Sequence, residues 1–141
     1  MKYIINERQY RLLTEEEQEV LQISSLNIFG GWEALQKFLE RKGNPLYSFE
    51  GYLNLRGTNI ESLGNLTSVG NSLDLRTTNI ESLGNLTSVG GNLDLRYNKI
   101  KSLGNLTSVG GILDLKRTPI SRKYSRAEIR QMVKVDGDIY L

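Results

Sequence analysis

The chain has no cysteine and no histidine among its 141 residues, and these absences exclude several kinds of site. Without cysteine, disulfides and thiolate metal sites are impossible. Without histidine, the Ser-His and Cys-His nucleophile pairs and the usual proton shuttle near neutral pH are also impossible. We therefore expect a protein that is not an enzyme, with no catalytic residues, no metal site and no cofactor.

A strong net charge and a long apolar run are absent as well. The formal net charge is only +2, so no overall field attracts nucleic acid or membrane. No apolar run approaches the roughly 18 residues that span a bilayer. The first residues, MKYIINERQYRLLTEEE, carry charges where a secretory signal has an apolar core. We expect a cytoplasmic protein, or one carried inside a particle, that does not bind membranes.

What the chain does contain is a repeat of twenty residues. The nine letters SLGNLTSVG occur without change at 62–70, 82–90 and 102–110. The differences between repeats collect on and just after the strand-like segment. Recent duplication explains this identity, and so does a constant scaffold that carries a varied binding face; the sequence leaves both explanations open.

Each repeat contains one strand-like segment. Leu93-Asp94-Leu95 alternates apolar and polar residues, which predicts a short strand with one buried face. Leu83 and Val89 belong to a run of apolar residues three apart, which fits a tight helical turn or an extended ridge. One repeat cannot bury its own leucines, so we expect repeats to stack and their strands to pair in parallel. The predicted strands cover 52–56, 72–76, 92–96, 112–116 and 138–141.

The unit L-x-x-L-x-x-V-x-x-x-L-x-L-x-x-[NT]-x-I resembles a leucine-rich repeat, a family with units of roughly 20–29 residues. It is most similar to the twenty-residue bacterial type, and such short repeat proteins are also familiar from bacteriophages. The resemblance implies an α/β repeat solenoid: a right-handed coil with one parallel sheet of about five short strands. In the family an asparagine side chain hydrogen-bonds the turn backbone. Its position is occupied here by Thr58, Thr78, Asn98 and Thr118.

We expect one continuous domain in three parts: an N-terminal helical cap (1–42), the repeats (43–120), and a C-terminal capping helix with a final strand (121–141). In the first part, Thr14 and Glu17 match a capping box, which predicts a helix. In the last part, Ser125 and Glu128 match a second one. Caps are expected because an open end of a repeat stack exposes leucines and unpaired backbone.

The exposed side of the predicted strands carries two charged rows, Asn54-Asp74-Asp94-Asp114 and Arg56-Arg76-Arg96-Lys116. One interpretation is a ladder in which the rows neutralise each other. The other is a set of fixed polar groups that matches a protein partner, for which tyrosine and arginine are the usual anchors. The candidate partner-binding residues are Tyr52, Arg56, Asp74, Arg76, Asp94, Arg96, Tyr97 and Tyr140.

A basic cluster near the end of the chain gives an alternative. Lys116, Arg117, Arg122, Lys123, Arg126, Arg130 and Lys134 stand against the single acid Glu128. This pattern fits a solvated capping helix, or an anion-binding patch for RNA, DNA or an acidic protein. The candidate anion-binding residues are Arg122, Lys123, Arg126 and Arg130. No known nucleic-acid-binding motif accompanies them.

Together these patterns favour a non-catalytic protein–protein interaction module. By analogy with phage repeat proteins, we expect a modulator of a host protein or an accessory particle component, in the cytoplasm of a bacterial or phage-infected cell. The alternative is binding of nucleic acid or another polyanion through 116–134. The terminal strand leaves an edge that a second copy can extend, so the chain is expected to be a monomer or a homodimer. Asp136 and Asp138 beside that edge fit a guard against such pairing.

Overall fold

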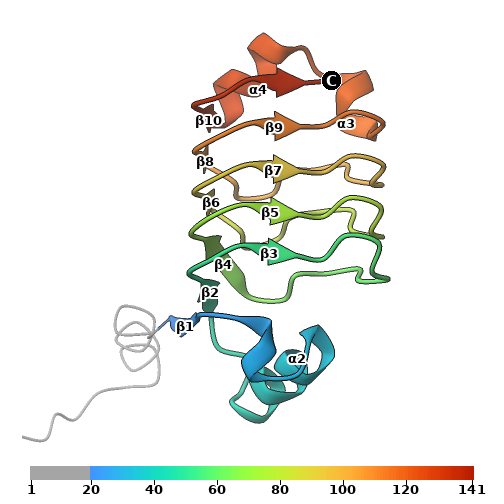
Figure 1. Cartoon of the computed structure of the whole chain (residues 1–141). Coiled ribbons are helices and arrows are strands. Elements are labelled where there is room, and N and C mark those ends of the chain that lie inside the picture. The colour runs from blue at the N-terminus through green and yellow to red at the C-terminus, as the bar shows by residue number, and fades with distance from the viewer. Residues whose placement is uncertain (1–19) are drawn as a thin grey trace, which may run out of the picture.

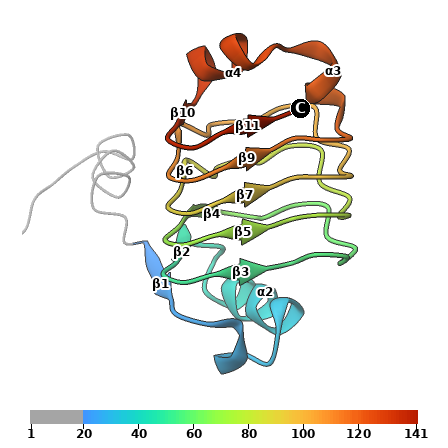
Figure 2. The same cartoon turned by 45° about the horizontal axis from the view of Figure 1, so that its top comes forward.

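The computed structural model describes residues 20–141. The predicted capping box of Thr14 and Glu17 lies outside the described residues. Two parallel sheets of short strands run through the described chain, with helices at both ends of the stack (Figures 1 and 2). The helical segments are η1 (Leu26–Ile28, a 3-10 helix), α2 (Trp32–Arg41), α3 (Pro119–Lys123) and α4 (Arg126–Met132).

Each repeat contributes one strand to each sheet. The first sheet has the order β1 (Leu21–Ile23), β2 (Tyr47–Phe49), β4 (Leu66–Val69), β6 (Ser88–Val89), β8 (Ser108–Val109) and β10 (Lys134–Val135). The second has β3 (Leu53–Asn54), β5 (Leu73–Asp74), β7 (Leu93–Asp94), β9 (Leu113–Asp114) and β11 (Ile139–Tyr140). Each of β3, β5, β7, β9 and β11 falls within a predicted strand, but only two residues of each form a ladder.

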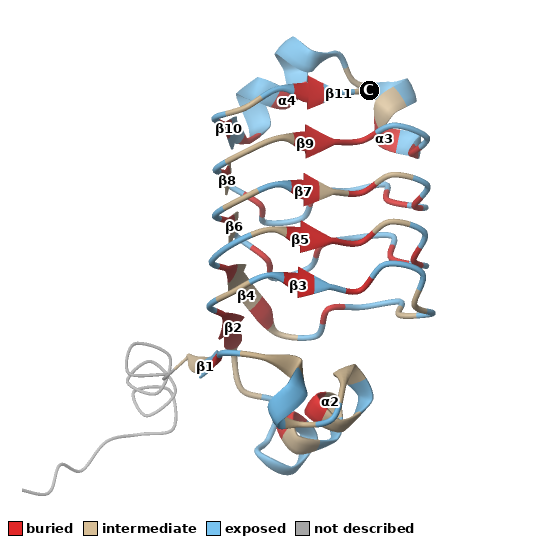
Figure 3. Cartoon of the chain, viewed as in Figure 1, coloured by how far each residue is buried: buried red, intermediate tan, exposed pale blue. Residues whose placement is uncertain are grey.

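The register confirms that successive repeats lie side by side. Leu73 is opposite Leu93, and Leu93 is opposite Leu113, so partners are twenty residues apart. At the end of the chain Ile139 pairs with Leu113, twenty-six residues earlier, so the predicted strand at 138–141 lies beside the one at 112–116. The leucines of these strands point into one continuous core and are essentially fully buried (Figure 3). Burying one such side chain contributes about 1.5–3 kcal/mol, so the core depends on correct stacking.

The prediction of one parallel sheet was wrong, because the structure contains two. Ser88 and Val89 are extended and pair in parallel with Ser108 and Val109, so the run that includes Leu83 and Val89 ends in a strand instead of a helical turn. The N-terminal region also contains a strand that the sequence did not predict, in addition to helices. It contains β1, which pairs with β2, and within the described residues one α-helix and one 3-10 helix.

The contacts of the repeated nine letters explain their identity. The Ser82 hydroxyl accepts a hydrogen bond from the backbone N–H of Gly84, at 3.1 Å, and Gly84 has a φ of +56°. Equivalent contacts occur in the repeats before and after. The Thr87 hydroxyl donates to the carbonyl of Thr67 one repeat earlier, at 2.9 Å, and Thr107 repeats this contact to Thr87. The stacking of identical levels therefore favours the same residue at each level, whether or not the duplication is recent.

The C-terminal helix α4 begins at the predicted capping box. Ser125 accepts from the backbone N–H of Glu128, and the Glu128 side chain accepts from the backbone N–H of Ser125. Two arginines of this helix then reach the last strands. Arg126 Nε donates to the carbonyl of Ile139 at 2.8 Å, and Arg130 donates to the carbonyls of Val135 and Gly137. The helix therefore closes this end of the stack by occupying backbone acceptors there.

Candidate binding surfaces

The outward side of the second sheet, here called the strand face, carries a continuous ladder of ion pairs. Arg76 Nη2 lies 2.6 Å from Asp74 Oδ2, and Arg76 Nε lies 3.3 Å from Asp94 Oδ2 in the next repeat. Arg96 repeats the arrangement with Asp94 and Asp114, at 2.7 and 3.4 Å. Lys116 ends the ladder 3.6 Å from Asp114. The two charged rows neutralise each other, as one interpretation of the sequence predicts.

Asp74 is held in its ionised form by this arrangement. Burial of the carboxyl opposes ionisation, but hydrogen bonds from the side chain and backbone of Arg76 outweigh it and lower the pKa of Asp74. The same contact raises the pKa of Arg76, and the hydrogen bond to Asp94 raises the pKa of Arg96. Asp74 and Arg76 therefore stabilise each other in their charged forms.

The first repeat departs from the pattern of the ladder. Asn54 stands where the later repeats have aspartate, and its side chain accepts a hydrogen bond from the backbone N–H of Arg56 at 3.0 Å. Arg56 is exposed, and no carboxylate of the described residues lies within ion-pair distance of it. Its positive charge still helps to lower the pKa of Asp74.

Three exposed tyrosines surround the ladder. Tyr52 precedes β3 at one end of the second sheet, and Tyr140 lies in β11 at the other end, opposite Asp114. The Lys116 ammonium is 5.2 Å from the centre of the Tyr140 ring. Partial burial and the Asp74 carboxylate raise the pKa of Tyr52. The strand face therefore combines balanced charge with aromatic side chains at both ends.

Tyr97, the third tyrosine, lies in the turn after β7 and is 62% exposed. Its φ is +60°, in the left-handed region, as are those of Thr77 and Arg117 at the equivalent positions of neighbouring repeats. Gly57 occupies this position in the first repeat. A left-handed residue with a side chain costs roughly 1–2 kcal/mol, so three repeats carry a strained residue where glycine fits without strain.

Three threonines occupy the repeat position at which Asn98 stands, and their hydroxyls hydrogen-bond the turn backbone. The Thr58 hydroxyl donates to the carbonyl of Leu55 at 2.7 Å, and Thr78 and Thr118 make the equivalent bonds in their own repeats. Asn98 donates to the carbonyl of Leu75, and its side-chain oxygen lies 2.7 Å from the Thr78 hydroxyl, whose single proton is shared between this oxygen and the Leu75 carbonyl. The turns after the strands are therefore fixed in position.

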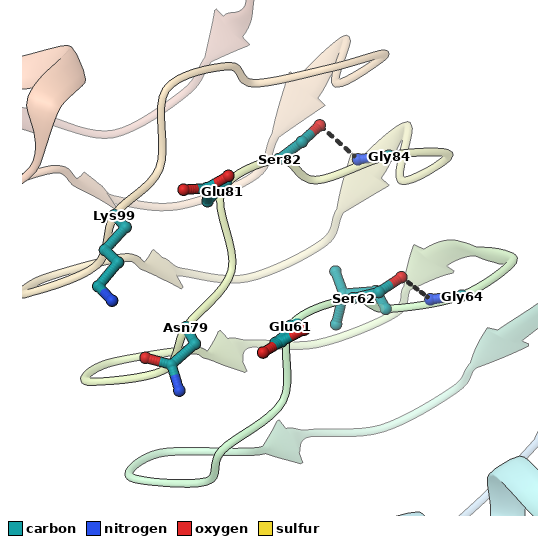
Figure 4. A pocket seen from close by; sticks show the side chains of 9 residues that line it. Glu61, Ser62, Gly64, Asn79, Glu81, Ser82, Gly84 and Lys99 are labelled. Carbon is teal, nitrogen blue, oxygen red and sulfur yellow. Dashed lines mark hydrogen bonds between the residues drawn. The ribbon is translucent and has the colours of Figure 1, made fainter.

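An open groove of about 580 Å³ lies between the turns of successive repeats. Figure 4 shows the side chains that line it. Glu61, Glu81 and Lys99 are its charged lining residues. The nearby serine hydroxyls accept hydrogen bonds from Gly64 and Gly84 (Figure 4). Within residues 20–141 no three acidic residues are placed to hold a metal ion. The two serine hydroxyls of the groove therefore serve as acceptors for the turn backbone.

The structure separates the four residues predicted to bind anions. The guanidinium groups of Arg126 and Arg130 are bound to backbone carbonyls, and the Lys123 ammonium lies 5.3 Å from the centre of the Tyr124 ring. Arg122 instead lines a different groove, with Lys99, Lys101 and Arg117. Lys99 and Lys101 lie one repeat before the basic cluster along the chain, and only the fold brings them beside Arg117 and Arg122.

No family model, curated protein or solved structure matches this chain. None of the helices in the described part of the chain is long and apolar enough to cross a membrane.

Proposed function

We propose that the chain is a leucine-rich-repeat-like right-handed solenoid that recognises another protein through the strand face and the turns beside it. The support for the repeat architecture is the pairing of equivalent leucines at an interval of twenty residues. The contact residues of this proposal are Tyr52, Arg56, Asp74, Arg76, Asp94, Arg96, Tyr97 and Tyr140. The proposal involves no catalytic step and no cofactor.

Tyr97 carries the proposal. Its ring is largely exposed and its backbone is in a conformation that glycine adopts more easily. A strained residue persists where something outweighs its cost, and such residues cluster at functional sites. Tyrosine buries a large area with little loss of conformational freedom, which makes it a frequent anchor of protein interfaces. These properties favour contact with a partner at this turn.

The charge of the strand face favours a protein over a polyanion. A phosphate backbone is bound by positive charges that have no local carboxylate partners. On the strand face, the arginines between Asp74 and Asp114 are each paired with carboxylates on both sides. Fixed and alternating charges of this kind select a partner with complementary charges and reject others.

The strand face alone is smaller than a standard protein interface, so the proposed interface also includes the turns. Five strands at about 4.8 Å spacing and about 17 Å length give only about 400 Å². A standard interface buries about 800 Å² on each partner. The remainder is supplied by the turn that carries Tyr97 and by the two capping regions. As in phage proteins of similar repeats, the partner is a host protein that this chain modulates or a component of a particle, in the cytoplasm of the host cell.

Two substitutions, at equivalent backbone positions of neighbouring repeats, test the proposal. Tyr97→Gly removes the exposed ring and relieves the left-handed backbone, so the variant is at least as stable as the wild type. Thr77→Gly gives the same backbone relief one repeat earlier and keeps every tyrosine. The wild type and both variants are used as baits in a bacterial lysate at low salt, with captured proteins identified by mass spectrometry.

The expected result is a defined protein that the wild type and Thr77→Gly recover and that Tyr97→Gly recovers at a level at least fivefold lower. The affinity of the purified partner for each bait is then measured directly. Recovery of no protein, or equal recovery by all three baits, contradicts recognition through this surface.

A further inference from the structure

A second surface, here called the basic groove, lies between the turn after β7, the turn after β9, and α3. It has a volume of about 340 Å³. Its lining residues are Glu81, Asn98, Lys99, Lys101, Arg117, Thr118, Pro119 and Arg122. Four cations therefore face one carboxylate, in contrast to the balanced charges of the strand face.

The single carboxylate neutralises little of this charge. Glu81 Oε1 lies 3.6 Å from Lys101 Nζ, and both side chains are more than half exposed, so the pair is weak. Among the described residues, no ion pair or side-chain hydrogen bond involves Lys99, Arg117 or Arg122. Three of the four cations are thus available to a ligand without breaking an existing contact.

The fold itself does not require cations at these positions. The repeat before has Asn79 where the third repeat has Lys99, and Glu81 where it has Lys101. The backbone of the two repeats is the same, and the nine letters that follow position 101 are unchanged. The switch from acidic to basic is therefore confined to the turn that borders the basic groove.

Arg117 adds an independent observation. Its φ is +62°, and Gly57 occupies the equivalent position at no steric cost. Its long side chain is exposed, and no hydrogen bond or ion pair to another described residue uses its guanidinium group. The left-handed backbone belongs to this turn in every repeat, but the guanidinium group is placed at the groove and is free to contact a ligand.

We propose that the basic groove binds phosphate groups, either of a free oligophosphate or of the backbone of a nucleic-acid strand. Arginine forks and lysine point charges together are the usual phosphate ligands of proteins. Pro119 is the only apolar residue of the lining, so the groove offers neither a pocket for a peptide side chain nor a ring on which a base stacks. Recognition is therefore independent of base sequence. This proposal stands apart from protein recognition by the strand face.

The test replaces the two lysines by the residues of the repeat before, in the double variant Lys99→Asn, Lys101→Glu. Both positions are exposed, and the same residues are accommodated one repeat earlier, so folding is preserved. The matched control, Lys37→Glu, Lys42→Asn, makes the same change of charge at two exposed positions in and just after α2. Circular dichroism and thermal unfolding check that all three proteins are folded.

Binding is measured with the intact protein by fluorescence anisotropy of a labelled twelve-residue oligothymidylate, at several salt concentrations from 50 to 200 mM. Tripolyphosphate and an oligoglutamate of equal charge serve as competitors. We expect the wild type and the control to bind within about threefold of each other. The groove variant binds at least tenfold more weakly, and its slope of log K against log salt is shallower by about 1.4, about 0.7 for each lost contact to a single strand.

The two competitors identify the source of the phosphate and its specificity. Competition by tripolyphosphate at an affinity similar to that of the oligonucleotide supports a free oligophosphate as ligand, and much weaker competition supports a nucleic-acid strand. Competition by oligoglutamate as strong as by tripolyphosphate overturns phosphate recognition. Absence of binding at 50 mM salt, or equal binding by the groove variant and the control, overturns the site.

Discussion

Arg76 and Asp94 belong to different repeats, yet Arg76 Nε lies 3.3 Å from Asp94 Oδ2. The same guanidinium lies 2.6 Å from Asp74 in its own repeat. The strand face therefore carries contacts between neighbouring levels as well as within one level. These contacts add to the parallel pairing of the backbones, and they depend on ionised carboxylates.

Asp74→Asn tests how much the ion pairs of the strand face contribute to stability and how this contribution depends on pH. Asn54 shows that asparagine in this position still accepts the backbone hydrogen bond, so the turn is retained and only the charged contacts are lost. We expect the free energy of unfolding at pH 7 to fall by about 1 kcal/mol, since charge-assisted bonds are worth more than neutral ones but Arg76 is partly exposed to solvent.

The sign of the pH dependence follows from the lowered pKa of Asp74. A carboxyl whose folded pKa lies below its ordinary value of about 3.9 stabilises the fold above that value, and this contribution is lost as the pH falls through the folded pKa. Urea unfolding at pH 7 and below pH 4 is therefore expected to show the gap between wild type and Asp74→Asn closing at acid pH. The exposed Asp136→Asn serves as control, and a gap that stays constant with pH contradicts the prediction.

Gly90→Ala tests the close approach of neighbouring repeats. A Cβ atom on Gly90 overlaps the carbonyl oxygen of Gly70, and the same overlap recurs between Gly110 and Gly90. The atom that the new Cβ meets is backbone between two stacked repeats and cannot move aside easily. We therefore expect the free energy of unfolding to fall by about 3 kcal/mol, at the upper end of the range for overpacked sites. Denaturant unfolding followed by circular dichroism measures it.

Gly84→Ala is the matched control for Gly90→Ala. Gly84 has a left-handed φ of +56°, but a Cβ atom there meets nothing within 4 Å. Only backbone strain opposes alanine at this position, and the expected loss is about 1 kcal/mol. We attribute the glycine at position 90 to the close spacing of the repeats and the glycine at position 84 to turn conformation. If Gly84→Ala lowers the free energy of unfolding as much as Gly90→Ala or more, the role of repeat spacing is contradicted.

The sequence predicted best what depends on local pattern and on the repeat interval. The alternation around Leu93 located a strand, and the interval of twenty residues placed Asp74, Asp94 and the arginines in adjoining rows. The second sheet was missed because the residues of β6 and β8 show no alternation of apolar and polar side chains, although these strands are as short as those that were predicted. Ser88 and Val89 pair because the neighbouring repeat presents the same backbone, which local sequence does not reveal.

The anion-binding candidates show more clearly what the sequence alone does not reveal. The sequence places Arg126 and Arg130 in a basic cluster, but their targets are the carbonyls of Ile139, Val135 and Gly137, which only the folded end of the stack brings within reach. The basic groove combines residues from three repeats and a helix. A cluster counted along the chain is therefore a poor guide to a cluster in space, even in a repeat protein.

Arg130→Ala tests the structural role of these hydrogen bonds. The substitution leaves the carbonyls of Val135 and Gly137 without their charged donor, so we expect a loss of about 2 kcal/mol in unfolding experiments. Arg130→Lys recovers little of it, because a lysine lacks the two-pronged geometry. Lys134→Ala, at an exposed position nearby, is expected to change stability by less than about 0.5 kcal/mol. Wild-type stability of Arg130→Ala rules out this role.

Removal of one whole repeat, residues 71–90, tests the stacking of levels as a whole. The deletion joins Gly70 to Gly91 and brings Leu53 opposite Leu93, with the Thr107 hydroxyl facing the carbonyl of Thr67. Each of these contacts is of a kind already present between adjacent repeats. Since stability in stacked repeats is approximately a sum over units and their interfaces, the shortened chain is expected to fold cooperatively, with a lower unfolding midpoint and a smaller dependence on urea.

Removal of half a repeat, residues 81–90, is the control for this deletion. It joins Ile80 to Gly91 and deletes β6, together with Leu83 and its turn, while β5 and β7 remain, so the first sheet loses one level and the second does not. No register then satisfies both sheets, and we expect loss of the cooperative transition and of the strand signal in circular dichroism. If the two deletions are equally disruptive, the twenty-residue level is not the unit of this fold; if only the half-repeat deletion unfolds the chain, the level is its structural unit.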